Sequence, residues 1–325
     1  MKRRRFLNDL VVGLAVPALA SAQSDYPNRP IRIVAAFSPG TGSDGIARAL
    51  AEELTKQMGA TVIVENREGA GGNIGHAFVA KSPADGYTLL MGTSIMAMAV
   101  HTVVPKPYDA SRDFAPIVRI SEAPMVALVG KNSKFRTWRD MVTYAKANPG
   151  KLNYITSGKG SSSHILMEVL MSEFGFTATD LPYKSSSQAI VDTASGQGDV
   201  FLANIPPARG LLDKGDLRMI ATGSAQRLAE FPEVPTFAEL AGKPDFRIVL
   251  WYGVLAPAGT PGAVIERLQR ELTTAASKPS VRQRVESAGG ALSLAGPQVL
   301  AEQIQVDNAR FARIIGDLKI ASGGR

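Results

Sequence analysis

Residues 31–58 read IRIVAAFSPGTGSDGIARALAEELTKQM, and this stretch decides the fold class. Its first part, 31–37, is almost wholly apolar, which predicts a buried strand. In 43–58 the apolar residues recur at helical spacing, which predicts a helix with one buried face. Further strands are predicted at 61–65 and 87–92. Strand–helix–strand order of this kind implies parallel pairing with right-handed crossovers, so the fold class is α/β.

The rest of the chain repeats this arrangement. The same patterns predict strands at 125–129, 152–156, 199–202, 217–222 and 248–255, helices at 137–147 and 162–174, and two helices near the C-terminus. A chain of 325 residues is long for a single hydrophobic core, so two domains are expected. We therefore predict two α/β lobes with a cleft between them, and in such open sheets ligands bind beyond the carboxyl ends of the strands.

The N-terminus carries an export signal at residues 1–22. A basic start (Lys2 to Arg5) precedes a short apolar run, and Ala20-Ser21-Ala22 offers the small residues that a signal peptidase accepts. Arg3-Arg4-Arg5-Phe6-Leu7 also fits the twin-arginine pattern, so export by either the Sec or the Tat route stays open. The pattern predicts a periplasmic protein whose signal is cleaved.

Composition and charge exclude several classes of function. The chain is 45% hydrophobic and 20% charged, which is ordinary for a globular protein, and the absence of cysteine excludes disulfides, thiolate metal sites and cysteine nucleophiles. Removing the signal takes away four basic residues and one acid, so the net charge falls from +7 to +4. The remaining basic residues are spread among acids, and we therefore expect no nucleic-acid partner.

Two loops carry the polar residues that could form a site. Residues 37–44 (FSPGTGSD) lie between a predicted strand and a helix, and residues 156–164 (TSGKGSSSH) have the same context in the second half. A helix N-terminus leaves backbone N–H donors unpaired and carries the positive end of the helix dipole. Two such loops facing each other across a cleft would hold a small anion, such as a carboxylate, from both sides.

Two enzyme classes remain as alternatives. Residues 40–45 spell G-x-G-x-x-G and Glu65 ends the next strand, as in an NAD-dependent oxidoreductase, although Ser38-Pro39 separates the strand from the first glycine. A secreted serine hydrolase could use a serine beside His164, but the chain has no G-x-S-x-G motif. The three histidines lie far apart without the spacing of metal ligands, so neither a metal nor a cofactor is expected.

At these residues the chain resembles the Bug proteins, the periplasmic solute receptors associated with tripartite tricarboxylate transporters. The resemblance covers nearly the whole mature chain. Its motifs, in order, are Tyr26-Pro27, Pro39-Gly40 with Asp44, Glu65-Asn66-Arg67, the run 69–75 (GAGGNIG), 85–90 (DGYTLL), 113–116 (DFAP), 152–154 (LNY), 182–184 (PYK), 234–236 (VPT) and 255–261 (LAPAGTP).

The resemblance implies a Venus-flytrap fold, the type II fold of periplasmic binding proteins. Residues 23–122 with 248–325 would form lobe 1, and residues 123–247 would form lobe 2. We place the strand crossings near 121–124 and 247–251. The implied activity is binding without catalysis, by a monomer that delivers its ligand to the membrane subunits of a transporter.

The resemblance also implies a set of ligand-binding residues. Backbone amides of the two loops would receive a di- or tricarboxylate or an aromatic acid, while Asp44 orients its loop instead of touching the anion. The implied residues are Phe37, Ser38, Gly40, Ser43, Asp44, Thr93 and Ser94 in lobe 1 and Ser157, Gly158, Gly160, Ser161, Ser162, His164 and Asn204 in lobe 2.

The chain departs from the family pattern at three positions. Thr41 follows Gly40 where the family usually has another glycine, and Lys159 stands where a neutral residue is frequent. Ala203 precedes Asn204 where the family often has an aspartate that can face the ligand. Because that acid could pair with an ammonium group, its absence predicts a weaker preference for amino acids.

Overall fold

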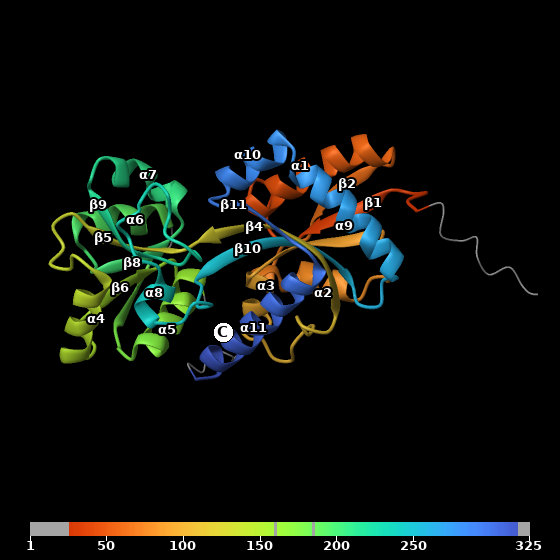
Figure 1. Cartoon of the computed structure of the whole chain (residues 1–325). Helices are drawn as coiled ribbons and strands as arrows, with labels where there is room; N and C mark the ends of the chain where they lie inside the picture. Colours follow the sequence, from red (N-terminus) through yellow and green to blue (C-terminus); the bar gives the residue numbers. More distant parts are fainter. Residues whose placement is uncertain (1–25, 159–160, 184–185, 318–325) are drawn as a thin grey trace, which may run out of the picture.

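The computed structural model describes residues 26–158, 161–183 and 186–317. The predicted signal at 1–22 and the loop residues Lys159 and Gly160 lie outside the described residues. Two α/β lobes stand side by side in Figure 1, and the strands β4 and β10 run between them. The predicted two-lobed α/β architecture is therefore confirmed. No helix within the described ranges is both long and apolar enough to cross a membrane.

Lobe 1 is built on a sheet in which the described residues form six strands in the order β11-β4-β10-β3-β1-β2. The strands are β1 (Ile31–Ala35), β2 (Val62–Asn66), β3 (Thr88–Thr93), β4 (Phe114–Pro124), β10 (Val249–Pro257) and β11 (Ala291–Ala295). β1 pairs in parallel with β2 and β3, as the strand–helix–strand order predicts. β10 is antiparallel to β3 and β4, since it returns from the other lobe.

Helices cover both faces of this sheet. α1 (Gly42–Met58), α9 (Gly262–Ala276) and α10 (Pro279–Ser287) share an apolar core with one face. The helices α2 (Asn73–Ala80), α3 (Ile95–Ala99) and α11 (Pro297–Asp317) cover the other, and a 3₁₀ turn, η1 (Ala70–Gly72), precedes α2. Ile46, Leu50 and Leu54 of α1 are fully buried, which confirms the helical face read from the sequence.

Lobe 2 contains a second sheet in the order β7-β6-β8-β5-β9. Its strands are β5 (Val126–Gly130), β6 (Asn153–Thr156), β7 (Thr179–Pro182), β8 (Val200–Ala203) and β9 (Leu217–Thr222). One face packs against α4 (Trp138–Ala147), α5 (Ser162–Phe174) and α8 (Phe237–Ala241), and the other against α6 (Ser186–Ser195) and α7 (Ile205–Asp213).

Three chain segments meet where the lobes join. Met125, between β4 and β5, donates its amide to Ile248 O at 2.9 Å, and Gly223 donates to Met125 O at 2.8 Å. Ile248 in turn donates to Gly223 O at 3.1 Å. These backbone bonds lie close to the predicted crossings. The lobe boundaries themselves, 23–122 with 248–325 and 123–247, stay a prediction.

The prediction of two C-terminal helices is wrong, because the segment after β10 forms α9, α10 and α11 with the edge strand β11 between the last two. Gly289-Gly290 and Gly296-Pro297 interrupt the helical pattern on either side of β11, and this five-residue strand is too short to show a clear period. α11 also reaches lobe 2: a groove of about 690 Å³ is lined by Ile314 of α11 and by Met171 of α5.

Candidate ligand-binding site

The carboxyl ends of the parallel strands in both lobes point toward the crossing. In lobe 1 Thr93, the last residue of β3, pairs with Tyr252 of the crossing strand β10. In lobe 2 Ala203, the last residue of β8, pairs with Val126, the first residue after the crossing. In lobe 1 the strand register places the loop after β1 level with the end of β3. In lobe 2 it places the loop after β6 level with the end of β8. Both predicted loops therefore leave their sheets at the edge nearest the other lobe.

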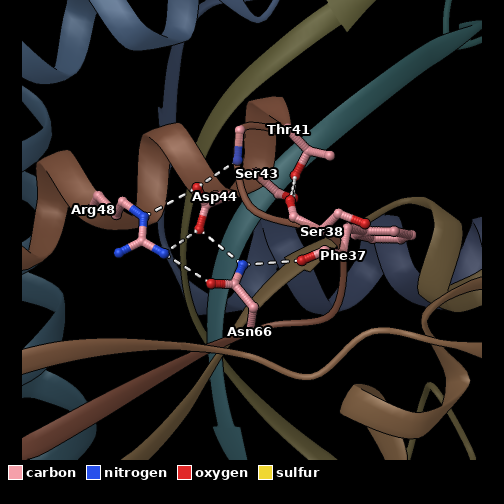
Figure 2. Close-up of polar contacts among 8 residues, drawn as sticks. Phe37, Ser38, Thr41, Ser43, Asp44, Arg48 and Asn66 are labelled. Atoms are coloured by element: carbon pink, nitrogen blue, oxygen red, sulfur yellow. Dashed lines mark hydrogen bonds and ion pairs between the residues drawn. The ribbon is translucent and has the colours of Figure 1, made fainter.

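Asp44 organises the first loop through hydrogen bonds that come from three sides (Figure 2). Its Oδ2 accepts from the Gly40 amide at 2.9 Å and from Arg48 Nε at 3.1 Å. Its Oδ1 lies 2.8 Å from the donor Asn66 Nδ2 and 2.9 Å from an Arg48 nitrogen. Asn66 also donates to Phe37 O at 3.0 Å, so one amide side chain joins both ends of the turn.

These bonds commit Asp44 to the loop and leave none of its oxygens free for a ligand. Burial raises the pKa of Asp44, but hydrogen bonds from Arg48, Gly40 and Asn66 and the charge of Arg48 outweigh it, so the pKa lies below its ordinary value. The carboxylate is thus ionised at neutral pH, and its charge is already balanced. The expectation that Asp44 orients the loop agrees with these contacts.

The N-terminus of α1 presents backbone donors beside this loop. Thr41 is the N-cap, but its side chain makes no capping bond and instead donates to Ser38 O at 2.8 Å. In the described part of the chain the amides of Gly42 and Ser43 have no hydrogen-bond acceptor. Unpaired amides at the positive end of a 17-residue helix can receive an anion. The Ser38 hydroxyl differs, because it donates to Glu68 and is already occupied.

Ser163, which the sequence analysis did not single out, organises the second loop. Its hydroxyl accepts from the Ser157 amide at 3.0 Å and lies 3.1 Å from the Ser157 hydroxyl and 3.0 Å from that of Ser161. Ser161 caps α5 by accepting from the His164 amide at 3.3 Å. The loop is thereby folded onto the first turn of α5, with Ser157, Ser161 and Ser162 half-buried.

A hydrogen-bonded relay from Asp180 through Thr156 holds Gly158 in place. The Thr156 hydroxyl accepts from the Gly158 amide at 3.2 Å and donates to Asp180 Oδ1 at 2.8 Å. The other carboxylate oxygen of Asp180 is buried and has no partner among the described residues. Asp180 thus positions the loop through Thr156, which only the pairing of β6 with β7 could reveal.

His164 lies behind the second loop, as expected, and not on its surface. Its ring stacks on Tyr154 with 6.4 Å between the ring centres and an angle of 16° between the planes. Its Nε2 is 3.9 Å from Glu168, which accepts a 2.8 Å hydrogen bond from Tyr154. Burial raises the pKa of Glu168, and the hydrogen bond from Tyr154 and the proximity of His164 partly oppose this. These contacts among Tyr154, His164 and Glu168 stabilise the start of α5.

Other polar groups lie at the strand ends around the crossing. The Ser94 hydroxyl and the Asn204 side-chain amide nitrogen are buried without a partner among the described residues. The Thr93 hydroxyl accepts from the Ile95 amide at 3.2 Å, which leaves its own proton available. Tyr252, which the sequence did not suggest, places its hydroxyl beside Gly42, 3.0 Å from where a β-carbon would stand.

The surroundings of the glycine motif at 40–45 do not suit a dinucleotide. In that fingerprint the second glycine admits the pyrophosphate, whereas here the space at Gly42 is filled by Ala288 and Tyr252. Glu65, which would bind the ribose, is paired with Arg32 and Arg67. The described residues also hold no group of three or more acidic or histidine side chains that could bind a metal ion.

Comparison with known proteins adds independent evidence. Residues 46–320 match the family model of the tripartite tricarboxylate transporter family receptor. The chain is 35% identical to protein BugT of Bordetella pertussis over 305 residues, which cover 93% of this chain and 92% of BugT.

Two of the similar solved structures are named with a bound carboxylate. The structure of R. palustris Rpa4515 with adipate is 30% identical, with a TM-score of 0.69, and the match covers 91% of this chain and 98% of that one. The structure of MatC from Rhodopseudomonas palustris with bound malate is 28% identical, with a TM-score of 0.67, and the match covers 89% and 100%. The family match, which spans both lobes, settles the classification: the chain belongs to the tripartite tricarboxylate transporter receptor family.

Proposed function

We propose that this protein is a periplasmic receptor that binds a small carboxylate between residues 37–44 and 157–164. The observation that carries the proposal is the pairing of two loops, one from each lobe, at strand ends directed toward the same crossing. Each loop opens a helix of 13 residues or more, so each offers backbone donors and a favourable dipole to an anion.

Binding and lobe closure follow from the same contacts. A ligand that touches both loops is held more tightly when the lobes are close, so it shifts the population toward a closed form. The closed form then differs in shape from the empty receptor, which lets membrane subunits of a tripartite transporter distinguish the two. The protein acts as a monomer with no nucleic-acid partner and catalyses no reaction.

The neighbours and the polar groups at the strand ends support the proposed ligand class. Adipate and malate, named with the two R. palustris structures, are both dicarboxylates. The Asn204 side-chain amide has no acceptor among the described residues, and such a donor suits a carboxylate or hydroxyl oxygen and not an ammonium group. Ala203, just before it, replaces an acid that is frequent in the family. We therefore propose di- or tricarboxylates or aromatic acids as ligands, in preference to amino acids.

Thermal unfolding of the exported form, residues 23–325, tests this function. A panel of dicarboxylates, tricarboxylates and aromatic acids should contain at least one compound that raises Tm in a concentration-dependent way. NAD serves as the control ligand, and hydrolysis of a generic ester tests the alternative enzyme class. Stabilisation by NAD without any by carboxylates, or ester turnover, would contradict the proposal. Native mass spectrometry of the freshly purified protein then identifies any acid that co-purifies.

A further inference from the structure

The turn between α10 and β11, residues 288–290, lies between the two lobes and belongs to neither ligand loop. α10 ends at Ser287, and Gly289 follows with φ of +85°, the left-handed conformation common after a helix. The amides of Gly289 and Gly290 donate to Glu286 O at 2.9 Å and Val285 O at 3.0 Å, so the turn is firmly tied to α10.

Gly289 approaches lobe 2 more closely than a side chain would allow without a shift of its neighbours. A β-carbon on Gly289 would stand 3.0 Å from Pro206 Cδ and 3.2 Å from Pro206 Cγ, and 3.5 Å from Asn204 Cβ. Carbon atoms in ordinary contact are about 3.5–4.0 Å apart, so the absence of a side chain allows this close approach. Both partners lie at the N-terminus of α7, where Asn204 is the N-cap and a candidate ligand residue.

The residues on either side of Gly289 rest on lobe 1. Ala288 packs against the start of α1, since a β-carbon on Gly42 would be 2.9 Å from Ala288 Cβ. Gly290 lies over the crossing strand β4, where its β-carbon would be 3.0 Å from Glu122 O. The turn therefore touches the first ligand loop, the crossing and the N-terminus of α7 within three consecutive residues.

From these contacts we propose that Gly289 is a positioning residue for ligand capture. The turn acts as a spacer that sets how closely the Asn204 end of α7 approaches the Gly42 end of α1. Because both ends belong to the proposed site, the distance between them decides whether a ligand can touch both lobes at once. This inference rests on the proposed function for its effect on affinity, but its effect on lobe spacing does not require a ligand.

The chain offers a matched control for the role of a helix-ending glycine. Gly59 follows α1 with φ of +64°, and a β-carbon there would meet no atom of the described residues within 4 Å. Gly59→Ala thus has the backbone strain of a left-handed alanine without a clash, whereas Gly289→Ala has the strain and the contact with Pro206 as well. If Gly289 only ends its helix, the two variants behave alike.

The affinity test compares these variants by titration calorimetry with the carboxylate that stabilises the wild type most. Gly289→Ala should weaken binding about tenfold or more, the order expected for one excess carbon in a tight contact, while Gly59→Ala should change it by about threefold at most. Adding Pro206→Ala to Gly289→Ala removes Cγ and Cδ and should restore most of the affinity. Equal losses in the two glycine variants, or no recovery in the double variant, would overturn the inference.

The spacing test needs no ligand, so it separates a failure of this inference from a failure of the proposed function. Since the chain has no cysteine, Lys278→Cys and Lys214→Cys place two spin labels on exposed positions, one in each lobe. Gly289→Ala should shift the distribution of label–label distances to longer values, and Gly59→Ala should leave it unchanged. Should Gly289→Ala fold poorly, Pro206→Ala alone should alter the distribution, because it removes the same contact from the other side. An unchanged distribution contradicts the inference even if carboxylates bind.

Discussion

Replacing Asp44 with asparagine tests the hydrogen-bond network that shapes the first loop. The carboxylate accepts bonds from the Gly40 amide, from Arg48 and from Asn66, and the residue is only 3% exposed. Asparagine has the same shape but only one acceptor oxygen, and its NH₂ group would face donors. At least one of the three partners therefore loses its acceptor.

The size of the effect follows from which partners can reach water. The Arg48 side chain is half-exposed and can be hydrated when its bond is lost, so we count only the bonds from Gly40 and Asn66. Asparagine keeps one of these two. A hydrogen bond to a charged group contributes roughly 1.5–3 kcal/mol, so Asp44→Asn should destabilise the protein by about 2 kcal/mol. For lobes of this size that corresponds to a decrease in Tm of roughly 4–8 °C.

The stability that Asp44 contributes depends on pH. The pKa of Asp44 in the folded protein lies below its ordinary value of 3.8, so the unfolded chain binds the proton more readily. The stability that Asp44 contributes is therefore fully present above pH 3.8 and is lost as the pH falls through the lower folded value. The difference between wild type and variant should be constant near neutral pH and should shrink only in acid.

Urea unfolding of both proteins across this pH range measures the difference. Asp213→Asn is the control, because Asp213 also pairs with an arginine four residues away but is 61% exposed, where such pairs contribute little. It should change the free energy of unfolding by less than about 1 kcal/mol. Equal effects of the two substitutions at neutral pH, or a difference for Asp44→Asn that persists unchanged in acid, would refute the reasoning.

Three further predictions follow from the second loop, a buried histidine and the ligand. Thr156→Val removes the hydroxyl that links Gly158 to Asp180 and leaves the half-buried Asp180 carboxylate without a hydrogen-bond donor among the described residues. It should lower stability by about 1–3 kcal/mol and weaken carboxylate binding in calorimetry, and a variant with wild-type stability and affinity would contradict the relay. Burial lowers the pKa of His76 from 6.5 to about 3, so the folded protein loses stability as the pH falls below 6.5. In urea titrations His76→Phe should make this decline shallower by up to about 1.4 kcal/mol per pH unit. An identical slope in the wild type and the variant would refute this prediction. Calorimetry should show tighter binding of succinate and glutarate than of aspartate and glutamate, and the reverse order would contradict the ligand class that we propose.

Local patterns were enough to predict much of the fold. The predicted helix at 162–174 and strand at 217–222 agree residue for residue with α5 and β9, since both are strongly apolar and end at clear turn residues. The two candidate loops were also found this way, because a glycine- and serine-rich run between a strand and a helix marks a strand's carboxyl end. The position of Asp44 in the first turn of a helix was enough to predict that it orients its loop, although its bond to Asn66 of β2 was not predictable.

Contacts that depend on sheet register or on distant chain segments could not be predicted. Asp180 reaches the second loop only because β7 pairs with β6, and the 288–290 turn reaches α1 and α7 only after both lobes have formed. Nothing local indicates that Ser163, and not Ser161 or Ser162, accepts the Ser157 amide. Such contacts follow from tertiary packing, which periodicity and residue type do not encode.

The most direct test of the central claim is a crystal structure of residues 23–325 grown with a dicarboxylate such as succinate. We predict that one ligand carboxylate lies between residues 40–43 and 157–163 and accepts hydrogen bonds from backbone amides of both lobes. A ligand that touches only one lobe, or that occupies the groove between α5 and the end of α11 instead, would contradict the claim.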